Sequence, residues 1–95
     1  MDISSFRDLP VCQRAIVTAL RQIGGRASVR YVFARLVPRA RQQSFFTREE
    51  VHRSIIQLLK SQVVWLDEEY PTWRLEKQTP AAAAKNLVAI ALRPR

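Results

Sequence analysis

The chain has 95 residues, and its 16 lysines and arginines against 8 acids give a formal net charge of +8. One cysteine, Cys12, and one histidine, His52, exclude an intramolecular disulfide and disfavour a zinc site. No apolar run is long enough to cross a bilayer, and acids near the start disfavour a signal peptide. We therefore expect one intracellular domain, cytoplasmic or nucleoid-associated, with no metal, cofactor or membrane contact.

The positive charge is concentrated in the middle of the chain. Residues 21–60 hold nine bases and two acids, Glu49 and Glu50, which is nine minus two, or +7. Eight of these nine bases are arginines, whose forked guanidinium groups suit phosphates and base edges better than lysine does. This distribution favours a polyanionic partner such as nucleic acid.

Two helices are predicted in the first part of the chain. Apolar residues recur at helical spacing from Leu9 to Ile23, with Pro10 in the first turn and Gly24-Gly25 as the stop. Cys12 falls on the apolar face and is interpreted as a small core residue. Arg26-Ala27 is a bridge or a single-residue strand. Ser28 then caps a second helix, which ends before Pro38.

The third predicted helix begins with Thr47 and Glu50, which form a T-x-x-E capping box, and Phe46 with Val51 occupies the hydrophobic-staple positions. Its apolar residues define an inner face. We expect a mixed outer face that could read a ligand, consisting of Glu49, His52, Arg53, Ile56 and Lys60, with Gln57 beside it.

Residues 63–66 and 72–76 are rich in strand-forming side chains and predict a two-stranded hairpin. The loop between them gathers three of the eight acids, Asp67, Glu68 and Glu69. Trp65 and Trp73 are expected to anchor the hairpin by cross-strand or core packing. The acidic tip is either solvated or a contact for a basic protein partner.

Residues 80–93 are almost entirely apolar and predict a C-terminal helix, with Thr79 as N-cap and Pro80 in the first turn. Burying such a helix favours a homodimer over the alternative, a tail folded on the first helix of a monomer. The predicted dimer interface consists of Leu87, Val88, Ile90, Ala91 and Leu92.

The stretch TREEVHRSIIQLLKSQVVWLDEEYPTWRL, a capped helix followed by two strand-like runs, resembles the third helix and wing of the winged helix-turn-helix family. The resemblance covers about Leu9 to Lys77. It implies a mainly α fold with a two-stranded hairpin, a winged-helix domain at 1–78 and the C-terminal helix at 79–95. Residues 47–61 would then be the recognition helix. Two features depart from the family: the long connection from Pro38 to Phe46, and an acidic wing that phosphates would repel.

The resemblance implies a sequence-specific regulator of double-stranded DNA, acting as a homodimer. The predicted DNA-binding residues are Arg26, Arg30, Arg35, Arg39, Arg41, Arg48, His52, Arg53, Gln57 and Lys60. A winged-helix adaptor that binds proteins is the alternative, and RNA binding is a third hypothesis. An enzyme is not expected, because His52 and Cys12 fall on different helices and no catalytic motif is present.

Overall fold

The computed structural model describes residues 4–37 and 46–94, and for residues 4–9 it describes the backbone alone. Within these ranges the chain is mainly helical with a small antiparallel sheet, as the sequence predicts at that level. The helices are α1 (Ser4–Gln22), α2 (Val29–Leu36), α3 (Arg48–Lys60), α4 (Thr72–Lys77) and α5 (Pro80–Ala83). The strands are β1 (Arg26–Ser28), β2 (Val64–Leu66) and β3 (Ala89–Leu92).

The local signals at the end of α1 and at the starts of α2 and α3 are confirmed. Ser28 caps α2 by accepting a hydrogen bond from the backbone N–H of Tyr31 at 3.1 Å. Thr47 and Glu50 form the complete capping box at the start of α3. Gly24 and Gly25, at φ +94° and +90°, turn the chain from α1 into β1, a conformation that favours glycine. Helix α1, however, begins at Ser4, so Pro10 lies inside it and not in its first turn.

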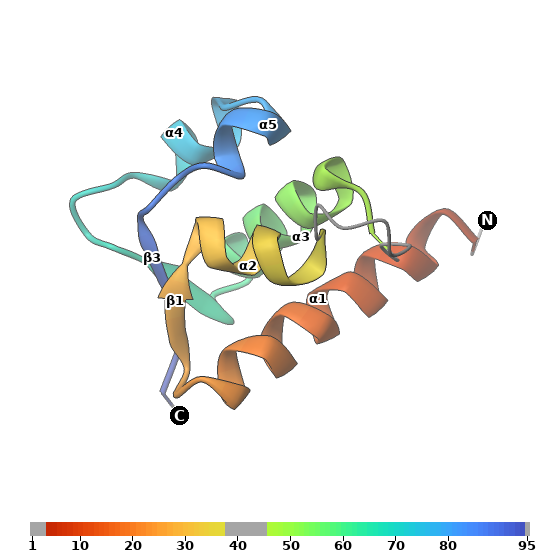
Figure 1. Ribbon diagram of the computed structural model, residues 1–95, viewed down its shortest axis with the longest axis horizontal. Helices are drawn as coiled ribbons and strands as arrows, with labels where there is room; N and C mark the ends of the chain where they lie inside the picture. Colours follow the sequence, from red (N-terminus) through yellow and green to blue (C-terminus); the bar gives the residue numbers. More distant parts are fainter. Residues whose placement is uncertain (1–3, 38–45, 95) are drawn as a thin grey trace.

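The predicted hairpin is wrong in its second strand. Residues 72–77 form α4, and the strand that pairs with β2 is β3, near the end of the chain. Strand β3 also pairs with β1, so the sheet order is β1-β3-β2 (Figure 1). The run Thr72–Glu76 has strand propensity, but its Leu75 is fully buried when the segment coils against α3. Packing therefore overrides the local preference.

The predicted C-terminal helix is also wrong beyond its first turn. Thr79 caps α5 through the N–H of Ala82, as expected, but the helix ends at Ala83. Asn86 then turns the chain: its Nδ2 contacts the Tyr70 hydroxyl at 3.0 Å and Gln78 Oε1 at 3.1 Å, and its Oδ1 accepts from Val88 N at 2.9 Å. These side-chain bonds compete with helix continuation.

Strand β3 thereby removes the predicted dimer surface. Ile90 is fully buried in the core of its own chain, whereas Val88, Ala91 and Leu92 are half-buried and Leu87 is exposed. The helix predicted to carry the interface does not exist, so the five residues do not lie together on one helical face. The division into a 1–78 domain and a separate 79–95 helix fails for the same reason, since β3 completes the sheet.

The core lies between α1, α2, α3 and the sheet. It is formed by Cys12, Ile16, Leu20, Val29, Val32, Phe33, Val51, Ile55, Ile56, Leu58, Leu59, Val64, Leu75, Ala83 and Ile90. Figure 1 shows α1 running beneath α2 and α3, with α4 and α5 at the opposite end of the molecule. The described helices include none with the length and apolar character needed to span a membrane.

Replacing Ile90 by alanine should lower the free energy of unfolding by about 2–5 kcal/mol, because a fully buried side chain leaves a cavity. The matched control, Leu87→Ala, removes an exposed side chain and should change it by less than about 0.5 kcal/mol. Urea unfolding followed by circular dichroism measures both. Equal effects of the two variants would contradict the position of β3.

Candidate nucleic-acid interface

Two of the residues predicted to read DNA from α3 are covered. His52 is only 8% exposed, and its Nε2 lies 2.9 Å from the backbone carbonyl oxygen of Leu75 in α4. Ile56 is 7% exposed and belongs to the core. Because α4 packs along this side of α3, neither side chain is available to the edge of a base. The prediction failed here because it placed residues 72–76 in a hairpin away from α3.

A narrow polar stripe of α3 remains exposed, formed by Glu49, Arg53, Gln57 and Lys60. Arg53 pairs with Glu49 at 2.7 Å, and Lys60 pairs with Glu76 of α4 at 2.8 Å. Each pair joins one cation to one acid, so the two pairs together carry no net charge. Gln57 accepts a hydrogen bond from Gln13 of α1. The stripe therefore offers hydrogen-bonding groups but little electrostatic attraction for phosphate.

A group of three cations without an ion pair among the described residues lies beside the start of α3. A groove of about 490 Å³ is lined by Arg30 of α2, Arg48 of α3 and Lys85, which follows α5. We call this the cationic groove; its apolar floor consists of Phe33, Ala34, Val37, Ala81 and Ala84. Within residues 10–37 and 46–94, the ion pairs include none made by its three cations.

The placement of Arg30 and Arg48 is unfavourable for the helices that carry them. Both lie in a first helical turn, where the helix dipole disfavours a cation by roughly 0.3–1 kcal/mol. The backbone donors of Val29 and Arg30 are already bonded to the carbonyls of Val88 and Asn86, so the side chains supply the attraction for an anion. The two arginines therefore destabilise their helices slightly, but they are well placed to bind an anion.

Arg26 and Arg35, two further predicted DNA-binding arginines, do not line the cationic groove. Arg35 donates to Gln22 of α1 at 2.8 Å, and Arg26 borders the hollow that also contains the acidic residues 67–69. Arg39 and Arg41 lie outside the described residues. The structure thus brings Arg30 and Arg48 together and adds Lys85, which sequence reasoning missed. No local signal marks Lys85, because its position depends on the turn that ends α5.

The acidic residues 67–69 form an exposed turn after β2, as expected for a loop, and Asp67 Oδ1 accepts from Glu69 N at 3.2 Å. The prediction that both tryptophans are buried anchors is wrong. Trp65 is 48% exposed and Trp73 is 60% exposed. Each ring instead has a cation above it, Arg93 over Trp65 and Lys77 over Trp73.

The described residues contain no cluster of metal-ligating side chains. Cys12 is buried in the core, as predicted, and burial raises the pKa of its thiol. A raised pKa and an inaccessible sulfur both lower the concentration of reactive thiolate at neutral pH.

Cys12 should therefore react with a thiol reagent such as DTNB far more slowly in the folded protein than in urea, and the reaction should follow opening of the core. Absorbance at the thionitrobenzoate band measures both rates. A folded-state rate equal to that of the unfolded chain would show that the rest of the core does not cover this thiol of α1.

Comparison of the chain with family models, curated proteins and solved structures gives no match.

Proposed function

We propose that this protein binds double-stranded DNA through the phosphate backbone, with the cationic groove as the principal contact. The observation that carries the proposal is the convergence of Arg30, Arg48 and Lys85, three cations without an acidic partner among the described residues. Phosphate contacts of this kind dominate non-specific affinity for DNA. The high net charge of +8 supports the same ligand class.

We further propose that the fold is a winged helix-turn-helix in which residues 67–88 replace the simple wing. Apart from α4 and α5, which lie between the last two strands, the order of elements is helix, strand, helix, helix, strand, strand, and this order supports the assignment. In that arrangement α3 is the recognition helix, and its N-terminal end lies next to the cationic groove. Phosphates bound there would bring the beginning of α3 toward the DNA.

Base recognition in this proposal is limited to the exposed polar stripe. Arg53 and Gln57 remain at the surface, and Arg53 can exchange its exposed partner Glu49 for a base edge at small cost. His52 and Ile56 make no base contact, since α4 covers them. We therefore propose a DNA-binding protein with modest sequence preference, whose affinity comes mainly from phosphates. A regulatory role in transcription would require stronger preference for particular DNA sequences than this stripe provides.

Duplex DNA affinity should fall with salt at a log–log slope of about −2.7 or steeper, since three neutralised phosphates contribute roughly 0.9 each. Lys85→Gln should flatten the slope by about 0.9 and weaken cognate and random duplexes alike. Fluorescence anisotropy with a labelled duplex, over a range of salt concentrations, measures affinity and slope together.

Lys77→Gln is the matched control, because it removes the same charge from an exposed lysine of α4 that does not line the cationic groove. We expect a smaller change in slope for this variant. Equal flattening by the two lysine variants would show that only the net charge matters. Failure to bind duplex DNA at low salt would remove the proposal.

A further inference from the structure

The sheet has one packed face and one open face. Val64 of β2 and Ile90 of β3 are buried in the core and therefore define the inner face. Successive strand residues point to opposite faces, so Trp65 and Ala91, which pair across these two strands, lie on the outer face. Arg26 of β1 pairs with Ala91 on its other side. Trp65 is 48% exposed and Arg26 is also exposed, so this row of three side chains faces solution.

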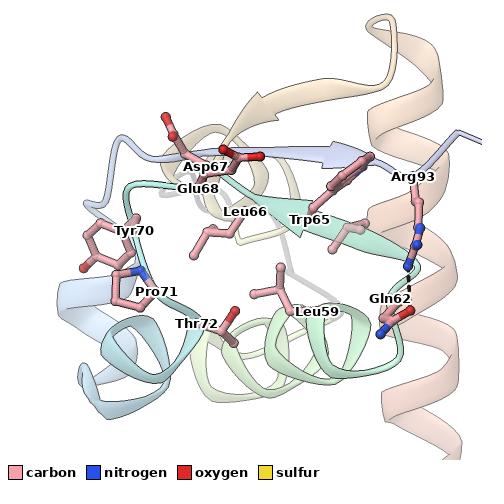
Figure 2. Close-up of a pocket in the computed structure, with 11 residues that line it drawn as sticks. Leu59, Gln62, Trp65, Leu66, Asp67, Glu68, Tyr70, Pro71, Thr72 and Arg93 are labelled. Carbon is pink, nitrogen blue, oxygen red and sulfur yellow. Dashed lines mark hydrogen bonds between the residues drawn. The ribbon is translucent and has the colours of Figure 1, made fainter.

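Trp65 lies between two hollows. The first, of about 390 Å³, lies between β2 and the helices α3 and α4, and Arg93 lines it (Figure 2). The Arg93 guanidinium lies over the Trp65 ring, 5.7 Å from its centre. The second, of about 530 Å³, we call the sheet hollow; the outer-face residues that line it are Arg26, Trp65, Ala89 and Ala91. Its remaining lining consists of Leu66, Leu92, Pro94 and the acidic residues 67–69. Because Arg93 does not line the sheet hollow, Trp65 presents to it a part of its surface that Arg93 leaves uncovered.

The sheet hollow combines an aromatic wall with groups of opposite charge. Its floor on β3 consists of Ala89 and Ala91, whose side chains are too short to fill it. Arg26 lies at one edge, and the described residues provide it with no ion pair. Asp67 follows the end of β2, where its backbone N–H donates to Ala89 O at 3.2 Å. The acidic residues 67–69 would repel a simple anion. A ligand whose negative group lies beside Arg26 must therefore direct hydrogen-bond donors toward Asp67.

We propose that the sheet hollow binds an unpaired base of single-stranded DNA. A nucleotide joins a negative phosphate to a flat base, and the edge of cytosine carries an amino donor that suits a carboxylate. The base stacks on Trp65 above Ala91. Arg26 binds the adjoining phosphate, and Asp67 accepts from the amino group of the base. The sheet hollow shares no lining residue with the cationic groove, so this site is separate from the duplex contact proposed above.

Fluorescence reports the stacking directly, because the chain has two tryptophans that can be removed one at a time. Trp73→Phe leaves Trp65 as the reporter, and an eight-residue oligo(dC) at about pH 8 should quench its emission in a saturable way. Trp65→Phe is the matched control. Trp73 is even more exposed but does not line the sheet hollow, so its emission should change much less. Equal quenching of the two tryptophans, or none of Trp65 up to about 1 mM oligonucleotide, would overturn the proposal.

Anisotropy of a labelled oligo(dC) measures the affinity. Trp65→Ala should weaken binding roughly 5- to 100-fold, because stacking on one aromatic ring contributes about that factor. Trp65→Phe keeps a ring and should lose less, and circular dichroism verifies that both variants are folded. Trp73→Ala should change the affinity less than about twofold. Equal losses from Trp65→Ala and Trp73→Ala would contradict a site in the sheet hollow.

The phosphate contact is separated from the cationic groove by a second pair of variants. Arg26→Gln should flatten the log–log salt dependence of oligo(dC) binding by about 0.7, the contribution of one single-strand phosphate. Lys85→Gln, which changes only the cationic groove, should leave this slope nearly unaltered. An equal or larger effect of Lys85→Gln would place the single strand in the cationic groove and overturn the proposal, whatever the outcome for duplex DNA.

The role of Asp67 is tested by the choice of base. Cytosine presents an N4 amino donor where thymine presents its O4 acceptor, so oligo(dC) and oligo(dT) carry the same charge but differ at this edge. Oligo(dC) should bind about three- to tenfold more tightly. Asp67→Asn keeps the oxygen that accepts from Glu69 N and should remove this preference. Glu49→Gln, which changes a remote exposed acid on α3, should retain it. Equal affinity of the unmodified protein for both oligonucleotides would overturn the proposed orientation of the base.

Discussion

The insertion of β3 between β1 and β2 is the constraint on which the other features of the molecule depend. Leu92 N donates to Gly25 O at 2.7 Å on one side, and Arg93 N donates to Val63 O at 3.0 Å on the other. Ile90, fully buried, fills the core beneath the sheet. The isolated two-stranded hairpin predicted from the sequence would be marginal in water, whereas a third strand with a buried face gives the sheet independent stability.

The position of β3 requires the connection from β2 to cross α3. Residues 67–88 make that connection, and α4 and α5 pack on α3 along the way. Leu75 and Ala83 are fully buried there, and Leu75 offers its carbonyl to His52. The same contacts that complete the core remove His52 and Ile56 from the surface. Packing of α4 and α5 on this face of α3 stabilises the fold and makes the same face inaccessible to a ligand, because one face of a helix cannot do both.

The connection formed by residues 67–88 also determines where the charged side chains lie. Lys85 is brought beside Arg30 and Arg48, while the acids 67–69 stay exposed at the turn after β2. The cationic groove has no acid in its lining, whereas the hollow that contains the acids 67–69 is also bordered by Arg26; among the described residues, none of these groups forms an ion pair with another. Unpaired like charges held close together repel one another, an arrangement that an oppositely charged ligand relieves.

The sequence by itself determined the features that depend on neighbouring residues. The capping box at Thr47 and Glu50, the caps at Ser28 and Thr79, the glycine turn and the buried Cys12 are all local or periodic signals, and the structure contains them. The positive net charge and its concentration in residues 21–60 are also properties of the sequence alone. Two of the three cations of the cationic groove, Arg30 and Arg48, could be named in advance on this basis.

The conformation of residues 72–93 was decided only by tertiary contacts. The alanine run has high helix propensity and forms α5, yet the helix does not continue, because Val29 N and Arg30 N at the start of α2 bond to Val88 O and Asn86 O. The alternation of Ile90 with small neighbours then suits a strand between two others. The partners in β1 and α2 lie more than fifty residues away along the chain, and those in β2 lie 24 to 28 residues away, so no local pattern reveals them. Hydrogen bonds and burial gained at long range outweigh a helix preference of less than about 1 kcal/mol per residue.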